Sequence, residues 1–232
     1  MDDRIIRLVD IATIYVQEYM SAFDSSHDYN HVARVLALAK MILKDENASL
    51  PRPSHAPRGD KNDWEPVPPM GLSEPVVVLG ALLHDVNDSK YLNQLESPVS
   101  LAELLKRWGA DHQLAIRVER LCQGVSYSTE MRDPQWVRNL IQEIPELAVV
   151  QDADRLDALG AVGIGRCFTF GASRGRGLPD SVRHFEEKLL QLERMMKTRT
   201  GREMAKARTE RIREFMRWWN DETEAIAGGM AF

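Results

Sequence analysis

The stretch LGALLHDVNDSK, residues 79–90, decides how this sequence is interpreted. An apolar run that starts at Val76 stops at His84-Asp85, so two metal-competent side chains follow directly on a segment that is expected to be buried. Removing an imidazole and a carboxylate from water is costly unless each finds a partner. A divalent cation would satisfy both groups together, whereas a helix-terminal His with a capping Asp would need only hydrogen bonds.

The apolar run itself is ambiguous in secondary structure. Val76, Val77 and Val78 favour a strand locally. The continuation LGALL and the length of the run favour a buried helix.

Composition predicts one globular domain over residues 1–232. The chain has 44% apolar and 28% charged residues, and its net charge of −5 gives no general attraction to nucleic acid or to a membrane surface. No 18-residue apolar span and no signal peptide are visible. We therefore expect a cytoplasmic protein, with the nucleus as the alternative. Two cysteines without metal-type spacing suit a reducing compartment.

Helical periodicity dominates the first half of the chain. Apolar residues predict amphipathic helices over residues 3–20 and about 29–43, and His31 lies one turn before Val35, at or beside the core. Residues 45–75 contain seven prolines and are predicted to form a surface insertion without regular structure. Short helices are expected at 100–108, about 112–121 and 136–144, with a connecting loop between the last two.

The segment QDADRLDAL, residues 151–159, is loaded with acids. Ala153, Leu156 and Leu159 interleave with the aspartates, so the segment cannot be entirely a solvated surface. We interpret it as the start of a helix, where the helix dipole would stabilise Asp152. Asp152 and Asp154 are both candidates for a metal-facing carboxylate.

Basic residues gather after this segment. FTFGASRGRG, residues 168–177, reads as a glycine-rich loop in which Arg174 and Arg176 either bind phosphate or are merely solvated. A helix from about residue 180 to 196 carries His184 and Lys188 on one face, and a final helix is expected over roughly 202–220. Strand signals are weak throughout, so the predicted class is all-α.

The set His31, His84, Asp85 and Asp154 forms the pattern H … HD … D. No single helix could supply all four. Two imidazoles and two carboxylates suit a first-row divalent ion with positions left for water and a phosphate oxygen.

These residues stand in four blocks that resemble the HD superfamily of metal-dependent phosphohydrolases, and most closely the small HD proteins related to bacterial nucleoside-triphosphate pyrophosphohydrolases. The blocks are HDYNHVARV, LLHDVNDSKY, VQDADRLDALGAVGIGR and HFEEKLLQL. The resemblance implies an orthogonal helical bundle with His31, His84, Asp85 and Asp154 as metal ligands. Asp152 is the second choice for the last position.

Further site residues are predicted around this set. Asp88 follows His84 by four residues, so a continuing helix would place it as general base or water-orienting group, with an exposed helix-end Asp as the alternative. Lys90 could offset phosphate charge. His27 is a candidate phosphate contact, and His184 and Lys188 match family positions for such contacts. Arg155 and Asp157 flank Asp154 and are expected to orient it.

The resemblance implies hydrolysis of a small nucleotide with one divalent ion, which could be Mn, Co, Ni, Fe, Mg or Zn. Binuclear members of the superfamily need further histidines between HD and the last Asp. His112 is the only histidine in that interval, which favours a mononuclear site. The favoured reaction converts a nucleoside or deoxynucleoside triphosphate to monophosphate and pyrophosphate. Alternatives are a nucleoside-monophosphate phosphatase and a non-catalytic nucleotide-sensing module. The expected partner is a small phosphorylated substrate, with no nucleic acid and no membrane; a homodimer is possible.

Overall fold

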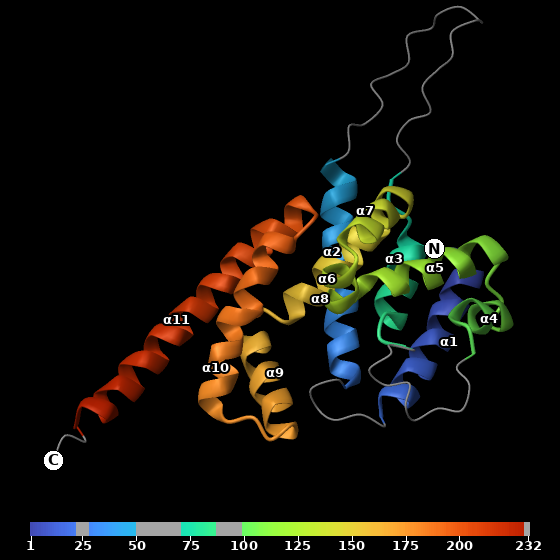
Figure 1. Cartoon of the computed structure of the whole chain (residues 1–232). Helices are drawn as coiled ribbons and strands as arrows, with labels where there is room; N and C mark the ends of the chain where they lie inside the picture. The colour runs from blue at the N-terminus through green and yellow to red at the C-terminus, as the bar shows by residue number, and fades with distance from the viewer. Residues whose placement is uncertain (22–27, 50–70, 87–98, 230–232) are drawn as a thin grey trace, which may run out of the picture.

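The computed structural model describes residues 1–21, 28–49, 71–86 and 99–229, and these ranges are helical without a strand (Figure 1). The predicted all-α class is therefore confirmed. The helices are α1 (Asp3–Met20), α2 (Tyr29–Ser49), α3 (Glu74–Leu83), α4 (Leu101–Arg107), α5 (His112–Val125), α6 (Tyr127–Arg132), α7 (Pro134–Glu143), α8 (Glu146–Asp157), α9 (Gly160–Ser173), α10 (Leu178–Glu187), the 3-10 helix η2 (Leu189–Met195) and α11 (Arg199–Gly229).

Helix α3 packs against α1, α2, α5 and α8, and it lies at the centre of this first group of helices. Every side chain from Val76 to Leu83 is buried, so this short helix is apolar on all sides. Pro75 occupies its first turn, where a missing N–H does no harm. Burial on every face outweighs the local strand preference of the three valines. The chain leaves the core at His84, and that exit brings His84-Asp85 to the edge of the bundle.

A second group contains α9, α10, η2 and α11. Helix α11 packs against α9 and η2, and Figure 1 shows its later turns running away from the other helices. Phe168, Phe185 and Phe215 form edge-to-face contacts at 5.6 to 6.0 Å between ring centroids, which join α9, α10 and α11. This group forms a wall opposite the end of α3.

The proline-rich segment starts later than predicted, because α2 continues to Ser49. The side chain of Asn47 accepts from the Leu72 amide and donates to the Leu72 carbonyl, at 2.9 and 3.2 Å. This contact extends the last turn of α2 by pairing it with the chain just before α3. Most of the predicted insertion, residues 50–70, lies outside the described residues.

The connecting loop predicted at residues 125–128 and 133–134 contains a helix instead, because residues 127–132 form α6. This helix buries none of its side chains, so it carries no apolar periodicity by which it could be recognised. A tertiary ion pair holds it instead: Glu130 accepts from Arg155 of α8 and from Lys197.

The acidic segment ends a helix rather than starting one. Helix α8 begins at Glu146, directly after Pro145, and the aspartates fall in its second half. The dipole of α8 therefore cannot stabilise Asp152. Its carboxylate instead accepts from the backbone N–H groups of Lys197 and Thr198, at 3.0 and 2.7 Å, just before α11.

The predicted glycine-rich loop is largely helical, because α9 extends to Ser173 and only Arg174 to Gly177 remain as a connection. The apolar side chains of Cys167 and Phe168 pack against the core and favour the helix. Gly175 has φ of +70°, and this left-handed residue turns the chain into α10.

The last two predicted helices also differ in their limits. The helix expected over 180–196 divides at Lys188 into α10 and η2, and α11 is longer than the predicted 202–220. None of the helices in the described ranges has both the length and the apolar character required to cross a membrane.

Candidate metal centre

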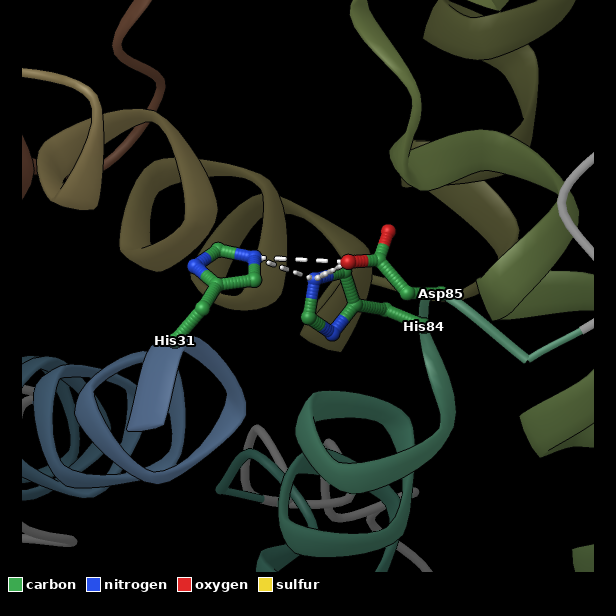
Figure 2. A group of neighbouring side chains, drawn as sticks. All are labelled: His31, His84 and Asp85. Atoms are coloured by element: carbon green, nitrogen blue, oxygen red, sulfur yellow. Dashed lines mark hydrogen bonds and ion pairs between the residues drawn. The ribbon is translucent and has the colours of Figure 1, made fainter. Parts of the chain in front are cut away.

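The four predicted ligands come from three separate segments and meet at one place. His31 lies in the first turn of α2, His84 and Asp85 follow the end of α3, and Asp154 lies in the last turn of α8. Figure 2 shows the two imidazole rings and the Asp85 carboxylate pointing toward one another. The convergence on which the metal hypothesis depends is therefore present.

The ligand atoms lie close together. The Nε2 atoms of His31 and His84 are 3.3 Å apart, and Asp85 Oδ2 lies 3.4 Å from each. Asp154 Oδ1 lies 3.6 Å from His31 Nε2 and 3.8 Å from His84 Nε2. Both histidine side chains are only 2% exposed, whereas that of Asp154 is 28% exposed, so the open side of the cluster is the Asp154 side.

Geometry also separates the two candidates for the last ligand. Asp152 is fully buried and its Oδ2 accepts from the Thr198 hydroxyl and backbone amide, both at 2.7 Å. Those bonds direct it toward the start of α11. Asp154 is the residue whose carboxylate faces the histidines, as the sequence pattern predicts.

Each histidine has its Nδ1 atom occupied by an acceptor. His84 Nδ1 lies 2.9 Å from the Ala81 carbonyl, and His31 Nδ1 lies 2.8 Å from Asp157 Oδ2. Because neither partner can donate, Nδ1 carries the proton in both rings, as assigned from these contacts. The Nε2 atoms of both rings therefore face each other and two carboxylates, where either a proton on His31 or a shared metal ion can lie between them.

The charges around His31 favour a cation strongly. Burial alone would lower the pKa of this imidazole, but the hydrogen bonds to Asp157 and Asp85 outweigh burial and raise the pKa to about 9. Burial likewise opposes ionisation of Asp157, yet bonds from His31 and Arg34 hold the pKa of its carboxyl well below the usual range. The negative groups that raise the pKa of His31, namely Asp157 and Asp85, would also interact favourably with a divalent ion at this ring.

The donor set fits a first-row divalent ion. One ligand atom each from His31, His84 and Asp85 lies within 4.8 Å of the others. Imidazole nitrogens combined with carboxylate oxygens suit zinc, manganese, iron, cobalt and nickel. The residues therefore form a candidate metal site, and the identity of the ion stays a prediction.

A cavity of about 410 Å³ opens beside the cluster. This volume lies within the range of small-molecule sites. Its lining combines the four candidate ligands with basic and apolar side chains, among them Tyr127, Arg166, Cys167, Phe170, Arg174, His184, Lys188, Leu189 and Leu192. The wall formed by α9, α10 and η2 thus faces the candidate metal centre with several cationic groups.

Three of the predicted substrate-binding residues line this cavity: Arg174, His184 and Lys188. The Lys188 ammonium lies 4.9 Å from the centroid of the Tyr127 ring, and the Arg174 guanidinium lies 5.4 Å from that of Phe170. Burial, followed by the charges of Arg176 and Lys188, lowers the pKa of His184, so this side chain is neutral at pH 7.

The other predicted positions have different outcomes. Arg176 is not among the described residues that line the cavity, although its charge acts on His184. His27, Asp88 and Lys90 lie outside the described residues, so their roles stay predictions.

The expected role of Arg155 is wrong. Its buried guanidinium binds Glu130 and the Met195 carbonyl, and therefore anchors α6 and η2 rather than orienting Asp154. Asp157, also expected to orient Asp154, binds His31 instead.

Arg166 was missed at the level of sequence. It lines the cavity and donates to Asp157 Oδ2 at 3.0 Å. The available signal was a single charged residue inside the small, otherwise uncharged segment GAVGIGRC, residues 160–167. Such a residue in a closely packed helix needs a partner nearby.

The chain is similar to known proteins over most of its length. The chain is 34% identical over 211 residues to the YpgQ protein of Bacillus subtilis, covering 88% of this chain and 87% of YpgQ. The crystal structure of YpgQ in complex with ADP superposes with a TM-score of 0.70 at 29% identity, over 94% of this chain and 96% of that one. A HD-superfamily hydrolase from Bacillus thuringiensis gives a TM-score of 0.63 at 26% identity, over 94% and 97% of the two chains.

The family model of the HD domain matches residues 28–159. This range spans more than half of the chain and contains His31, His84, Asp85 and Asp154. The chain has the predicted HD-type helical bundle, similar to that of YpgQ. This protein belongs to the HD-domain family.

Proposed function

We propose that this protein is a divalent-metal-dependent phosphohydrolase of small nucleotides, with nucleoside or deoxynucleoside triphosphate converted to monophosphate and pyrophosphate as the favoured reaction. The observation that carries the proposal is the position of the candidate metal centre at one side of a cavity whose facing wall is basic. The similarity to YpgQ, which was crystallised with ADP, supports a nucleotide as the ligand.

His31, His84, Asp85 and Asp154 would hold the ion. When bound, the divalent ion supplies Lewis acidity toward a phosphate oxygen and lowers the pKa of water. The fixed Nδ1 contacts of both histidines keep their Nε2 atoms directed into the site, so no reorientation is needed. Asp154, the most exposed of the four, has carboxylate surface open to the cavity, where it can accept a hydrogen bond from water.

The basic wall would hold the phosphates. Arg166, Arg174 and Lys188 offer charged donors, and neutral His184 offers a hydrogen bond. Several such groups suit a polyphosphate better than a single phosphate. In the proposed reaction the oxygen of water bonds to the α-phosphorus while the bond from that phosphorus to the bridging oxygen breaks. Pyrophosphate leaves, and Asp88 is the predicted acceptor of the water proton.

The reaction can be tested on purified protein freed of metal with a chelator. Nucleoside triphosphates and monophosphates would each be incubated with Mn, Co, Ni, Fe, Mg or Zn, and pyrophosphate and orthophosphate measured separately. Pyrophosphate from triphosphates supports the proposal. Orthophosphate from monophosphates would identify the phosphatase instead. Nucleotide binding without turnover in the presence of every metal tested would support the non-catalytic sensor instead.

Ligand replacement tests whether the proposed centre performs the reaction. His84→Ala and Asp85→Ala should each lower turnover by more than about 100-fold, since loss of a ligand exceeds the 10- to 100-fold typical of groups that only support one. The matched control is His112→Ala, because His112 is exposed at the start of α5 and does not line the cavity. Undiminished turnover in a folded, metal-free His84→Ala protein would contradict the proposal.

A further inference from the structure

Asp157 is a buried carboxylate surrounded by donors. Its side chain is 1% exposed, and Oδ2 accepts from His31 Nδ1 at 2.8 Å, from an Arg34 terminal nitrogen at 3.0 Å and from Arg166 at 3.0 Å. Oδ1 accepts from Arg34 Nε at 2.7 Å. A carboxylate with bonds on both oxygens from three side chains has almost no freedom to rotate.

Three helices bring these donors together. His31 and Arg34 are three residues apart on α2 and share one face, while Asp157 is the last residue of α8. The chain then reverses through Gly160, whose φ is +71°, and a Cβ on Gly163 would lie 2.1 Å from the Ala158 carbonyl oxygen. This close approach of α9 to the end of α8 returns Arg166 to Asp157.

We propose that Asp157 is the positioning residue for His31, and that Arg34 and Arg166 fix the carboxylate so that it holds the imidazole with Nε2 directed at the metal ion. A hydrogen-bonded acceptor on the far nitrogen fixes the tautomer and the ring plane of a ligating histidine. The inference rests on the proposed metal-dependent function, because the orientation of His31 matters only if His31 binds an ion.

The alternative is a purely structural ion pair that ties α2, α8 and α9 together. The two roles differ in what they predict for metal binding. A structural pair affects the free energy of unfolding, whereas a positioning residue also affects the affinity of the folded protein for the ion. Asp152 provides a matched control, since it is a buried aspartate in the same helix whose bonds run to Lys197 and Thr198.

The experiment measures binding of Mn²⁺ alone to wild type, Asp157→Ala, Asp157→Asn and Asp152→Asn by calorimetry and electron paramagnetic resonance. Asp157→Ala should bind about 10- to 100-fold more weakly than wild type. The affinity of Asp157→Asn should fall between these two. Its amide oxygen can still accept a hydrogen bond, whereas its amide N–H group faces only donors. Asp152→Asn should unfold more easily but bind Mn²⁺ as wild type does.

The outcomes separate the inference from the function on which it rests. Failure of wild type to bind any ion of the metal panel removes the proposed function. Binding by wild type together with unchanged affinity in folded Asp157→Asn and Asp157→Ala overturns the positioning role alone. If Asp157→Ala does not fold, the affinity of Asp157→Asn decides. An equal loss of affinity in Asp152→Asn would also overturn the inference, because the effect would then follow from destabilisation.

Discussion

His31 is in contact with three carboxylates, those of Asp85, Asp154 and Asp157, at 3.4, 3.6 and 2.8 Å. Such a residue binds a proton or a metal ion, but Nε2 cannot bind both at once. The single imidazole therefore links the pH dependence of stability to that of metal binding.

In the metal-free protein the pKa of His31 is raised to about 9, above the ordinary value of about 6.5 in an unfolded chain. Its stabilising contribution is therefore complete below about pH 6.5 and is lost as pH rises through about 9. We expect the melting temperature of metal-free protein to fall across this window. A His31→Gln variant should lose this part of the pH dependence, and an unchanged profile would contradict the assignment.

Metal binding should change in the opposite direction over the same window. Because the ion displaces the proton from Nε2, affinity should rise with pH, and binding at about pH 7.5 should release close to one proton from His31. Calorimetry in buffers of different ionisation enthalpy measures this number. Binding without proton release would show that His31 is neutral before the ion arrives.

Between elements, the contact of α8 with the start of α11 depends on Asp152. Its carboxylate accepts from two backbone N–H groups and from the Thr198 hydroxyl. Asp152 therefore acts as a capping residue for α11, although it comes from a distant part of the chain. Gly201 permits the approach, since a Cβ there would lie 2.3 Å from Asp152 Oδ2. Glu46 of α2 adds a second such contact to Thr200.

Asp152→Ala should therefore destabilise the protein without touching the metal centre. Unpaired buried donors cost about 1–3 kcal/mol each, so we expect the free energy of unfolding to fall by at least about 2 kcal/mol in urea. Asp10→Ala, an exposed position on α1, is the control and should change it by less than about 0.5 kcal/mol. A loss in Asp152→Ala no larger than that of the control would show that α11 does not depend on this cap.

For the whole molecule, a bound ion would join three segments that are far apart in sequence: the start of α2, the end of α3 and the end of α8. The unfolded chain cannot hold these segments together. Ion binding should consequently stabilise the folded state as a whole.

At about 100 times its dissociation constant, Mn²⁺ should stabilise the protein by about 2.7 kcal/mol and raise the melting temperature by about 5–10 °C. Differential scanning fluorimetry with and without a chelator measures the shift. His112→Ala should respond as wild type does, while His84→Ala should not respond. A shift in His84→Ala equal to that of wild type would place the stabilising ion elsewhere.

Much of the fold could be read from the sequence, because apolar periodicity records which face of a helix is buried. It predicted the all-α class, α1 and the burial of His31, and it favoured the correct buried helix for α3. It missed α6, whose side chains are not buried and whose anchor is Glu130 bound to Arg155. The acids of α8 were also placed at the wrong end of a helix, because the donors that bind Asp152, the backbone N–H groups of Lys197 and Thr198, are distant in sequence.

The sequence by itself determined the candidate ligand set, because the four blocks that resemble the HD superfamily contain His31, His84, Asp85 and Asp154 in order. The resemblance preferred Asp154, but only the tertiary structure decided that Asp152 turns away to the start of α11 and that Asp157 holds His31 across 126 residues of chain. Local pattern specifies which side chains avoid water. Which of them meet depends on how the helices pack, and packing is settled by contacts between residues distant in sequence.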